Sequence, residues 1–325
     1  MSNIEIVGLG ALNMDSIYQV ERILTDGETV VKESASFPGG SAANTIYGLA
    51  KLGVSAGFIG VVGDDAEGKI LLHDFQTVGV DTSQIKTKRN AKTGSVLCLS
   101  DSHGRRSLYV LPGANNLLTT DDLDLAYINR AKMLHLSSFA DEKQFRVLLE
   151  LISKLDSPTK LSFAPGALYA SKGLKALTPI LARTHILFVN QNEMGQLTRQ
   201  DVITGAESCL KQSCHIVVVT LGRGRRLELG ERLSHNAICY IRDAENEYAV
   251  ESSGQAVSEV DTTGAGDAFA AGFLYGLLTG KGLRECGLLG DIVARFDITR
   301  LGTRQGFPTL AELAQRYQKL YSGQL

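Results

Sequence analysis

The stretch "KMLHLSSFADEKQFRVLLELISKLDSPTKLSFAP" (residues 132–165) indicates the fold class. Its two ends, 132–138 and 160–165, are apolar runs of strand length. Between them, residues 142–155 carry apolar side chains at helical spacing. A strand that is apolar throughout is buried on both faces, which is typical of a parallel sheet covered by helices. The stretch therefore predicts a strand–helix–strand unit of an α/β protein.

The same alternation extends along most of the chain. Further strand-like runs occur at residues 4–10, 56–62, 185–190 and 215–222. Segments with helical spacing occur at residues 41–53, 66–79, 173–182 and 265–280. The first of these helices is expected to begin with Ser41 as its cap and to end at Gly53. The pattern predicts a mainly parallel central sheet with helices on both faces.

Two segments interrupt this alternation and are expected to form antiparallel hairpins. Residues 12–37 include Asp26-Gly27, a turn signal flanked by alternating residues. Residues 93–112 contain two strand-like runs around His103-Gly104. Four such strands would make a small sheet beside the main one, and insertions of this kind often act as lids. We therefore expect one domain, 1–325, with a lid formed by these two segments.

The composition excludes several classes of protein. The net charge of -2 provides no basic field for nucleic acid or anionic membrane. The five cysteines form no C-x-x-C motif, which is typical of a reducing compartment. No apolar run reaches the roughly 18 residues of a membrane span, and the start of the chain lacks the features of a signal peptide. We expect a cytoplasmic protein that binds neither nucleic acid nor membrane.

The first expected strand and the residues that follow it read "IEIVGLGALNMD" (4–15). This stretch nearly matches the dinucleotide fingerprint G-x-G-x-x-G. The acidic residue that this fingerprint requires would be Glu28. Because Glu28 falls in an expected hairpin and not at the end of a second core strand, a dehydrogenase is not supported. Gly8 and Gly10 are interpreted as close-packing positions in and after a core strand.

The stretch "VDTTGAGDAFAAGF" (260–273) carries the most chemical information. Gly264 and Gly266 allow backbone amides to turn inward at the start of a helix. These unpaired donors at the positive end of the helix dipole make an anion site. Asp267 in the first turn suits a group that accepts a proton while the amides stabilise charge. The alternative is that Asp267 only caps the helix above a structural loop.

The stretch "FPGGSAANTIYGLAKLG" (37–53) suggests a binding site for a polyhydroxy ligand. Gly39 and Gly40 permit close backbone approach, and Asn44, one turn inside the helix, offers a donor and an acceptor. The alternative is a helix cap with a buried amide.

Two strand ends carry further candidate residues. Asn190 and Glu193 follow a buried strand, and the carboxyl ends of parallel strands face the ligand crevice. Thr220, Gly222 and Gly224 follow another buried strand. The alternative for both groups is an ordinary polar loop.

In this order and spacing, the four stretches resemble the signatures of the ribokinase/PfkB family of sugar and nucleoside kinases. "PGGSAANTIYGLAKLG" resembles its glycine-pair signature, and "DTTGAGDAFAAGF" resembles its carboxyl-terminal signature. Asn190 to Glu193 fits its N-x-x-E motif, whereas "TLGRG" fits T-x-G-x-x-G loosely, because Gly224 falls one residue early. The resemblance covers nearly the whole chain. It implies a three-layer α/β/α sandwich with a mainly parallel central sheet plus a small β-sheet lid.

The resemblance also implies an activity, which is ATP-dependent transfer of the γ-phosphoryl group to a hydroxymethyl group. In the family pattern, Asp267 is the base that takes the hydroxyl proton. The amides of Gly264, Ala265 and Gly266 form the anion hole. The residues implied to bind the acceptor are Asp15, Gly39, Gly40 and Asn44.

The same resemblance implies a nucleotide site and its ions. The residues implied to line this site are Asn190, Glu193, Thr220, Gly222 and Gly224. Glu193 would organise Mg²⁺, mainly through water. Asp261 lies where many members bind a monovalent cation such as K⁺.

The acceptor is predicted from finer resemblance. "GGSAANT" and the late stretch "LRECGLLGDIVARFDITRLGTR" look most like the bacterial adenosine-kinase-like branch. Adenosine or another nucleoside is therefore expected ahead of a free sugar such as ribose or fructose. Three residues depart from the family pattern: Ala164 replaces a common acid, and Asp291 and Arg295 lie near the adenine pocket where smaller or neutral residues are usual.

Two alternatives stay open at this point. A family member that has lost catalysis would bind nucleotide as a sensor, although the intact Asp267 and its glycines argue against this. Edge strands of a lid sheet can pair across a homodimer, but a monomer is equally compatible with the sequence.

Overall fold

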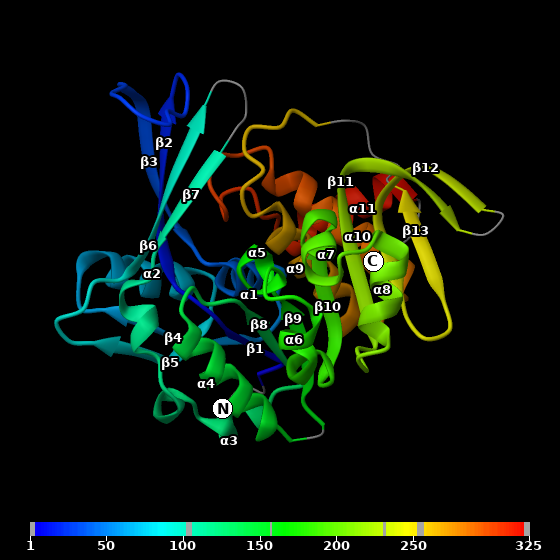
Figure 1. Ribbon diagram of the computed structural model, residues 1–325, viewed down its shortest axis with the longest axis horizontal. Coiled ribbons are helices and arrows are strands. Elements are labelled where there is room, and N and C mark those ends of the chain that lie inside the picture. Colours follow the sequence, from blue (N-terminus) through cyan, green and yellow to red (C-terminus); the bar gives the residue numbers. More distant parts are fainter. Residues whose placement is uncertain (1–3, 102–105, 157, 230–231, 252–256, 322–325) are drawn as a thin grey trace.

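The computed structural model describes residues 4–101, 106–156, 158–229, 232–251 and 257–321. Within these residues, nine strands form the large sheet. They are β1 (Ile6–Leu9), β4 (Ala56–Gly63), β5 (Asp81–Lys88), β8 (Met133–Ser137), β9 (Lys160–Ala164), β10 (Thr184–Asn190), β11 (Ile216–Leu229), β12 (Arg232–Arg242) and β13 (Glu247–Glu251). Their spatial order is β13-β12-β11-β10-β9-β8-β1-β4-β5 (Figure 1). Only the pairs β11 with β12 and β12 with β13 are antiparallel.

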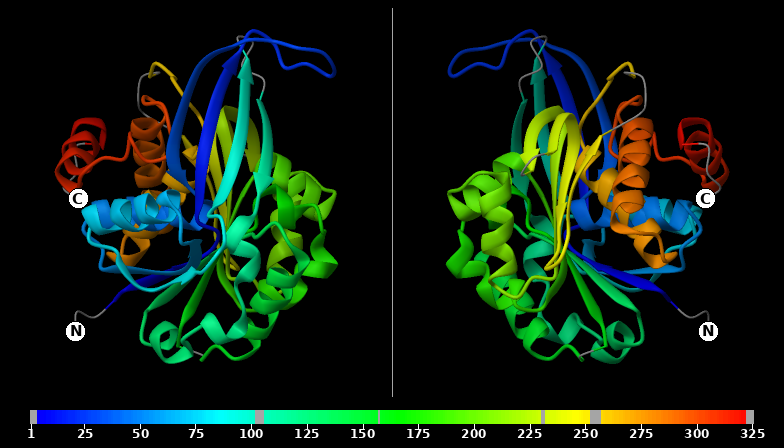
Figure 2. Two further views of the ribbon diagram at one scale, coloured as in Figure 1. Left: turned by 90° about the vertical axis from the view of Figure 1, so that its left-hand side faces the viewer. Right: turned by 90° about the vertical axis from the view of Figure 1, so that its right-hand side faces the viewer.

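Helices cover both faces of this sheet (Figure 2). One face carries α1 (Ser41–Lys51), α2 (Ala66–Thr77), α9 (Ala265–Leu278), α10 (Leu283–Asp297) and α11 (Leu310–Tyr321). The other carries α3 (Leu125–Asn129), α4 (Glu142–Ser153), α5 (Gly166–Ala170), α6 (Leu174–Leu181), α7 (Gln191–Thr198) and α8 (Val202–Leu210). The predicted α/β sandwich is therefore confirmed. Among the described residues, none of these helices has the length and apolar character needed to span a bilayer.

The core consists of two apolar layers, one on each face of the sheet. Because successive side chains of a strand point to opposite faces, Ile6 packs in one layer and Val7 in the other. Gly8 faces the same layer as Ile6, and a Cβ there would come within 2.4 Å of Ile46 Cγ1 and 2.7 Å of Phe58 Cδ2. Gly8 is thus a close-packing position, as interpreted from the sequence.

A second, smaller sheet stands apart from the large one (Figure 2). Its strands are β2 (Asn13–Val20), β3 (Val31–Gly39), β6 (Gly94–Asp101) and β7 (Arg106–Leu111). Their order is β3-β2-β6-β7, with two antiparallel hairpins joined by the parallel pair β2 and β6. Both predicted hairpins are present, and the predicted turn at His103-Gly104 lies outside the described residues.

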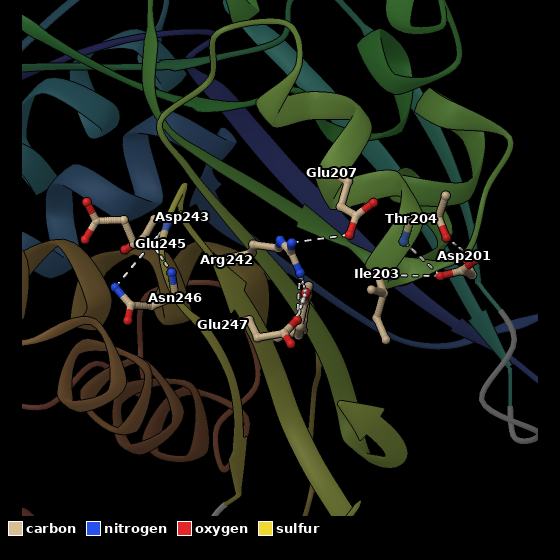
Figure 3. A network of polar contacts seen from close by, with 10 residues as sticks. Asp201, Ile203, Thr204, Glu207, Arg242, Asp243, Glu245, Asn246 and Glu247 are labelled. Atoms are coloured by element: carbon tan, nitrogen blue, oxygen red, sulfur yellow. Dashed lines mark hydrogen bonds and ion pairs between the residues drawn. The ribbon is translucent and has the colours of Figure 1, made fainter. Parts of the chain in front are cut away.

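Ion pairs fix the antiparallel end of the large sheet. Arg242 of β12 lies between α8 and β13 (Figure 3). Its Nη2 is 3.3 Å from Glu207 Oε1, and its Nη1 donates to Glu247 Oε2 at 2.8 Å. These contacts tie β12 to its neighbours, next to the strand that carries Thr220.

A carboxyl group with a strongly raised pKa lies at the end of α10. Asp297 is fully buried, and neither of its carboxyl oxygens has a partner within hydrogen-bond geometry in the described part of the chain. Burial raises its pKa to about 8, the negative charges of Asp267 and Asp261 add to this effect, and the nearby amide of Gly306 and the charge of Lys51 oppose it. The neutral acid is therefore the form that the fold accommodates.

This burial predicts a pH-dependent stability difference. The pKa of Asp297 in the fold exceeds the value of about 3.9 in an unfolded chain. Its favourable contribution is therefore complete below pH 4 and is lost as the pH rises through about 8. Asp297→Asn removes the ionisable group. The free energy of unfolding of the variant minus that of the parent should therefore increase by roughly 2–5 kcal/mol when the pH is raised from 5 to 9.

Urea unfolding at pH 5, 7 and 9 measures this difference, with the exposed Asp121→Asn as the control. A variant-to-parent difference that does not change with pH would show that Asp297 does not titrate in the fold.

Candidate active site

The Asp267 carboxylate is held against the start of another helix. Its Oδ1 accepts a hydrogen bond from Ser41 Oγ at 2.7 Å, and its Oδ2 accepts one from Asn44 Nδ2 at 2.9 Å. Thr45 Oγ1 donates to its backbone carbonyl at 3.3 Å. The N-cap of α9 is Gly264, which makes no side-chain capping bond. The carboxylate therefore contacts α1, and the alternative that it caps its own helix is wrong.

Gly40 makes this contact possible at the start of α1. It is the N-cap of the helix, with a φ of 103°, and a Cβ there would come within 2.1 Å of Ala11 O. Ser41 is the first helical residue, so the predicted Ser41 cap is wrong. Because the tight turn at a glycine starts the helix, the Ser41 hydroxyl is free to reach Asp267.

The first turn of α9 has the features expected of an anion site. Gly264 adopts a φ of 84°, and the first regular helical bond runs from Ala268 N to Gly264 O. The amides of Gly266 and Asp267 have no hydrogen-bond partner among the described residues. A Cβ at Gly266 would meet nothing within 4 Å, so the side-chain position of this residue faces open space. Such unpaired amides at the positive helix end favour an anion.

A cavity of about 630 Å³ opens beside this turn. Ala265 and Gly266 line it, together with Thr220 and Gly222 from β11. Gly224 does not line this cavity, because its missing side chain faces Asn236, whose Oδ1 would lie 1.9 Å from a Cβ. The structure thus brings the predicted nucleotide residues of β11 to the anion site, with Gly224 as the exception.

The far wall of the cavity belongs to α10. Asp291 and Arg295 line it, and Arg295 Nε donates to Asp291 Oδ2 at 2.8 Å. At the mouth, Arg223 Nη2 donates to Glu259 Oε2 at 2.6 Å. Apolar side chains, among them Ile238 of β12 and Phe269 of α9, complete the lining of the cavity.

Asp261 joins the anion loop to the segment that follows α10. Its Oδ1 accepts from Thr263 N at 2.9 Å, and its Oδ2 accepts from Gly302 N at 3.1 Å. The backbone of Val260 adds a bond from its amide to Ile298 O at 2.8 Å. The carboxylate thus fixes the position of the loop before Gly264.

Asn190 and Glu193 form a capping box at the start of α7. Asn190 Oδ1 accepts from the amide of Glu193, and Glu193 Oε2 accepts from the amide of Asn190, both at 2.9 Å. Burial raises the pKa of Glu193, and the nearby charge of Asp267 adds to it. The described residues contain no group of three or more His, Cys, Asp or Glu side chains arranged to hold a metal ion.

Asp15 lies on β2 beside the Gly39 end of β3. A Cβ at Gly39 would come within 2.1 Å of Asp15 Oδ2, so only glycine fits there. Asp15 Oδ1 is buried and has no hydrogen-bond partner among the described residues. Burial raises the pKa of Asp15 to about 7, which the charge of Arg304 opposes and the charge of Asp267 reinforces. This orphaned oxygen is suited to accept a ligand hydroxyl.

Arg304 is a site residue that the sequence analysis missed. Its side chain is only 2% exposed, and its Nη1 donates to Asp74 Oδ2 at 2.5 Å. Its guanidinium carbon lies 5.3 Å from the ring centre of Tyr47 and 5.1 Å from that of Phe75. An arginine in a glycine-containing loop is typical of the surface, so no local pattern distinguished it.

The assembled groups suit transfer of an anionic group to a hydroxyl. Burial raises the pKa of Asp267 to about 6, while hydrogen bonds from Asn44 and Ser41 and the charge of Arg304 act in the opposite direction. A carboxylate with a pKa near neutrality is an effective general base. The unpaired amides beside it can stabilise negative charge on the transferred group.

Comparison with known proteins agrees with this chemistry. The pfkB family carbohydrate kinase profile matches residues 3–310. An uncharacterized sugar kinase from Archaeoglobus fulgidus is 37% identical over 264 residues, which are 80% of this chain and 98% of the relative. A nucleoside kinase from Methanocaldococcus jannaschii is 25% identical over 320 residues, which are 98% of each chain.

The fold has close counterparts among solved structures. Ribokinase from Thermotoga maritima superposes with a TM-score of 0.80 at 24% identity, covering 97% of this chain and 99% of its own. The family profile spans nearly the whole chain, and the sugar kinase relative exceeds a third in identity. The chain therefore belongs to the pfkB family of carbohydrate kinases and is a phosphotransferase that acts on a sugar or nucleoside.

Proposed function

We propose that this kinase transfers the γ-phosphoryl group of ATP to a hydroxymethyl group of a nucleoside, with adenosine first and a free sugar such as ribose or fructose next. The observation that carries the proposal is the position of Asp267. Its carboxylate lies in the same helical turn as the unpaired amides of Gly266 and Asp267, and Gly266 of this turn lines the cavity that Thr220 and Gly222 also line. A base and an anion hole are thus adjacent.

In this proposal, Asp267 accepts the proton of the attacking hydroxyl. Ser41 and Asn44 hold the carboxylate in place, and the unpaired amides of Gly266 and Asp267 stabilise charge on the transferred group. The amide of Ala265, predicted to join them, instead donates to Thr262 O at 3.3 Å. The transition state of phosphoryl transfer is loose, so positioning and charge stabilisation supply most of the rate. Asp15 accepts a hydroxyl of the acceptor through its unpartnered Oδ1, next to the Gly39-Gly40 turn.

Groups at the cavity and close to Asp267 fit a magnesium nucleotide. The unpaired helix amides suit the phosphates, and the capping box at the start of α7 uses only Oε2 of Glu193. Its Oε1 is therefore left to hold a water ligand of Mg²⁺. Bound Mg²⁺ would neutralise charge on the phosphates. A K⁺ site at Asp261 stays a prediction.

The preference for a nucleoside acceptor has support from sequence similarity. The Methanocaldococcus jannaschii relative, which aligns over nearly its whole length, is a nucleoside kinase. The Archaeoglobus fulgidus relative is described only as a sugar kinase. Adenosine is therefore the first acceptor to test, with inosine, ribose and fructose beside it.

The proposal extends to the lid, the oligomeric state and the compartment. We treat the chain as one kinase domain in which segments 12–37 and 93–112 close over the acceptor. Leu108, Tyr109, Val110 and Leu111 are exposed on β7, an edge strand that could pair with a second copy. Light scattering distinguishes this homodimer from a monomer. The five free, buried cysteines support a cytoplasmic, reducing environment.

A coupled assay of ADP release over nucleosides and free sugars tests the proposal. Release that depends on a nucleoside is the expected result. No release with any acceptor, despite measurable ATP binding, would instead support a catalytically silent nucleotide sensor. Nothing in the arrangement of Asp267 and its loop favours that alternative.

Removal of the Asp267 carboxylate should separate catalysis from nucleotide binding. We expect Asp267→Asn and Asp267→Ala to lower kcat by about 10²- to 10⁴-fold, because a positioned base contributes that much. The dissociation constant for ATP should stay within about threefold, since the loop amides remain. Steady-state kinetics and calorimetry measure the two quantities.

The matched control is Glu67→Gln, which changes an exposed acid in the first turn of another helix, α2. Its kinetics should equal those of the parent. Turnover of Asp267→Ala within threefold of the parent would remove Asp267 from the role of base.

The pKa of Asp267 also predicts a pH profile. Because the base acts when ionised, kcat/KM should rise with pH through an acid limb and level off above neutrality. The pKa of Asp267 is raised to about 6, and the pKa of Asp15 is raised to about 7. Because the two carboxyl groups are electrostatically coupled, the acid limb of the profile reflects the titration of both groups together. Asp15→Asn should leave a simpler limb near pH 6 and raise KM for the acceptor more than for ATP. A flat profile between pH 5 and 7 would contradict the assignment of the base.

A further inference from the structure

We propose that Arg304 is a positioning residue that sets the orientation of the Asn44 carboxamide and thereby aims it at the Asp267 carboxylate. This inference rests on the proposed role of Asp267 as the base. Arg304 lies 260 positions from Asn44 in the sequence, in the loop between α10 and α11. It touches neither reacting group directly, so its effect on the position of the base would pass through Asn44.

The geometry of Asn44 supports this role. Its Oδ1 accepts from Arg304 Nε at 2.9 Å. Thr303 Oγ1 lies 3.3 Å from the same oxygen, but its shorter hydrogen bond, at 2.8 Å, is to Pro38 O. Its Nδ2 donates to Asp267 Oδ2 at 2.9 Å. A carboxamide has a donor end and an acceptor end, and a half-turn of the group would place its oxygen against the carboxylate. The Arg304 donor on Oδ1 therefore determines that the amino end faces Asp267.

Arg304 is itself held rigidly. Its Nη2 donates to Gly39 O at 3.1 Å, and its Nη1 donates to Asp74 Oδ2. The guanidinium also packs over the rings of Tyr47 and Phe75. Each nitrogen of the planar fork has its own acceptor, an arrangement that a lysine ammonium cannot reproduce. The Gly39 contact further links Arg304 to the turn proposed to bind the acceptor.

The charge of Arg304 acts on the same groups. Asp74 of α2, Asp15 of β2 and Tyr47 of α1 all raise the pKa of the guanidinium, against the effect of its burial. In return, Arg304 opposes the rise in pKa that burial imposes on Asp15 and Asp267. The charge of Asp267 also raises the pKa of two further acids, Glu193 of α7 and Asp297 of α10. Arg304 thus favours the ionised form of the base as well as its position.

Two substitutions separate the geometry of Arg304 from its charge. Arg304→Lys keeps a positive charge but loses the fork. Arg304→Gln combined with Asp74→Asn removes the charge without leaving the Asp74 carboxylate unpaired. The control is Arg300→Gln, an exposed arginine in the same loop.

With adenosine as the acceptor, Arg304→Lys should lower kcat by about 10- to 100-fold, as expected for a misplaced catalytic group. KM for ATP should change less than threefold, and Arg300→Gln should behave as the parent. The proposal would be overturned if Arg304→Lys kept the parental kcat, or if it raised KM for the acceptor and KM for ATP by the same factor.

A second readout does not require turnover. Carbon-13 NMR of aspartate-labelled protein follows the Asp267 carboxyl, with Asp267→Asn for its assignment. Arg304→Lys should titrate at higher pH than the parent, because an Asn44 carboxamide that has turned no longer lowers the pKa of Asp267 through its hydrogen bond. The double variant, which also loses the positive charge, should titrate at higher pH than the parent as well. An unchanged Asp267 titration in Arg304→Lys would overturn the proposal. If no acceptor is phosphorylated, the proposed function fails while this titration still decides the role of Arg304.

Discussion

The hydrogen bond from Asn44 Nδ2 to Asp267 Oδ2 joins the two helix starts on which the site depends. Both α1 and α9 begin after a glycine with a positive φ, and each turn exposes the amides or side chains of its first residues. The two helices pack closely, since a Cβ on Gly48 would lie 2.9 Å from that of Ala271. Because 223 positions separate the bonded residues, tertiary packing and not local sequence places the base.

A surplus of buried carboxyl groups gives the site its electrostatic character. Burial raises the pKa of Asp15, Glu193, Asp267 and Asp297 alike. A group whose pKa lies near neutrality can exchange a proton readily, and perturbed acids of this kind gather at functional sites. The buried cation of Arg304 offsets the rise at two of them, the two that face the proposed acceptor. Catalysis and acceptor binding would therefore respond together to pH.

Much of the fold could be predicted from the sequence because strand and helix periodicities are local. Gly264–Asp267 and Gly39–Asn44 also stood out, since glycines directly precede apolar helices. Ser41 was assigned to capping because serine before a helix is typical of a cap, and only the turn at Gly40 shows otherwise. Arg304 depends on contacts with α1, α2 and β3 that no local pattern encodes. Asp297 did carry a signal, because an acid in the last turn of a helix opposes the dipole.

The central claim is that Asp267 takes the proton of the acceptor hydroxyl. A crystal structure tests it most directly, with two ligands bound: the acceptor that the enzyme phosphorylates, in its unphosphorylated form, and a non-hydrolysable ATP analogue. The account predicts that the reacting hydroxyl lies within about 2.6–3.2 Å of an Asp267 carboxylate oxygen, with the γ-phosphate facing the amides of Gly266 and Asp267. A hydroxyl bound beyond reach of Asp267, with another carboxylate beside it, would contradict the account.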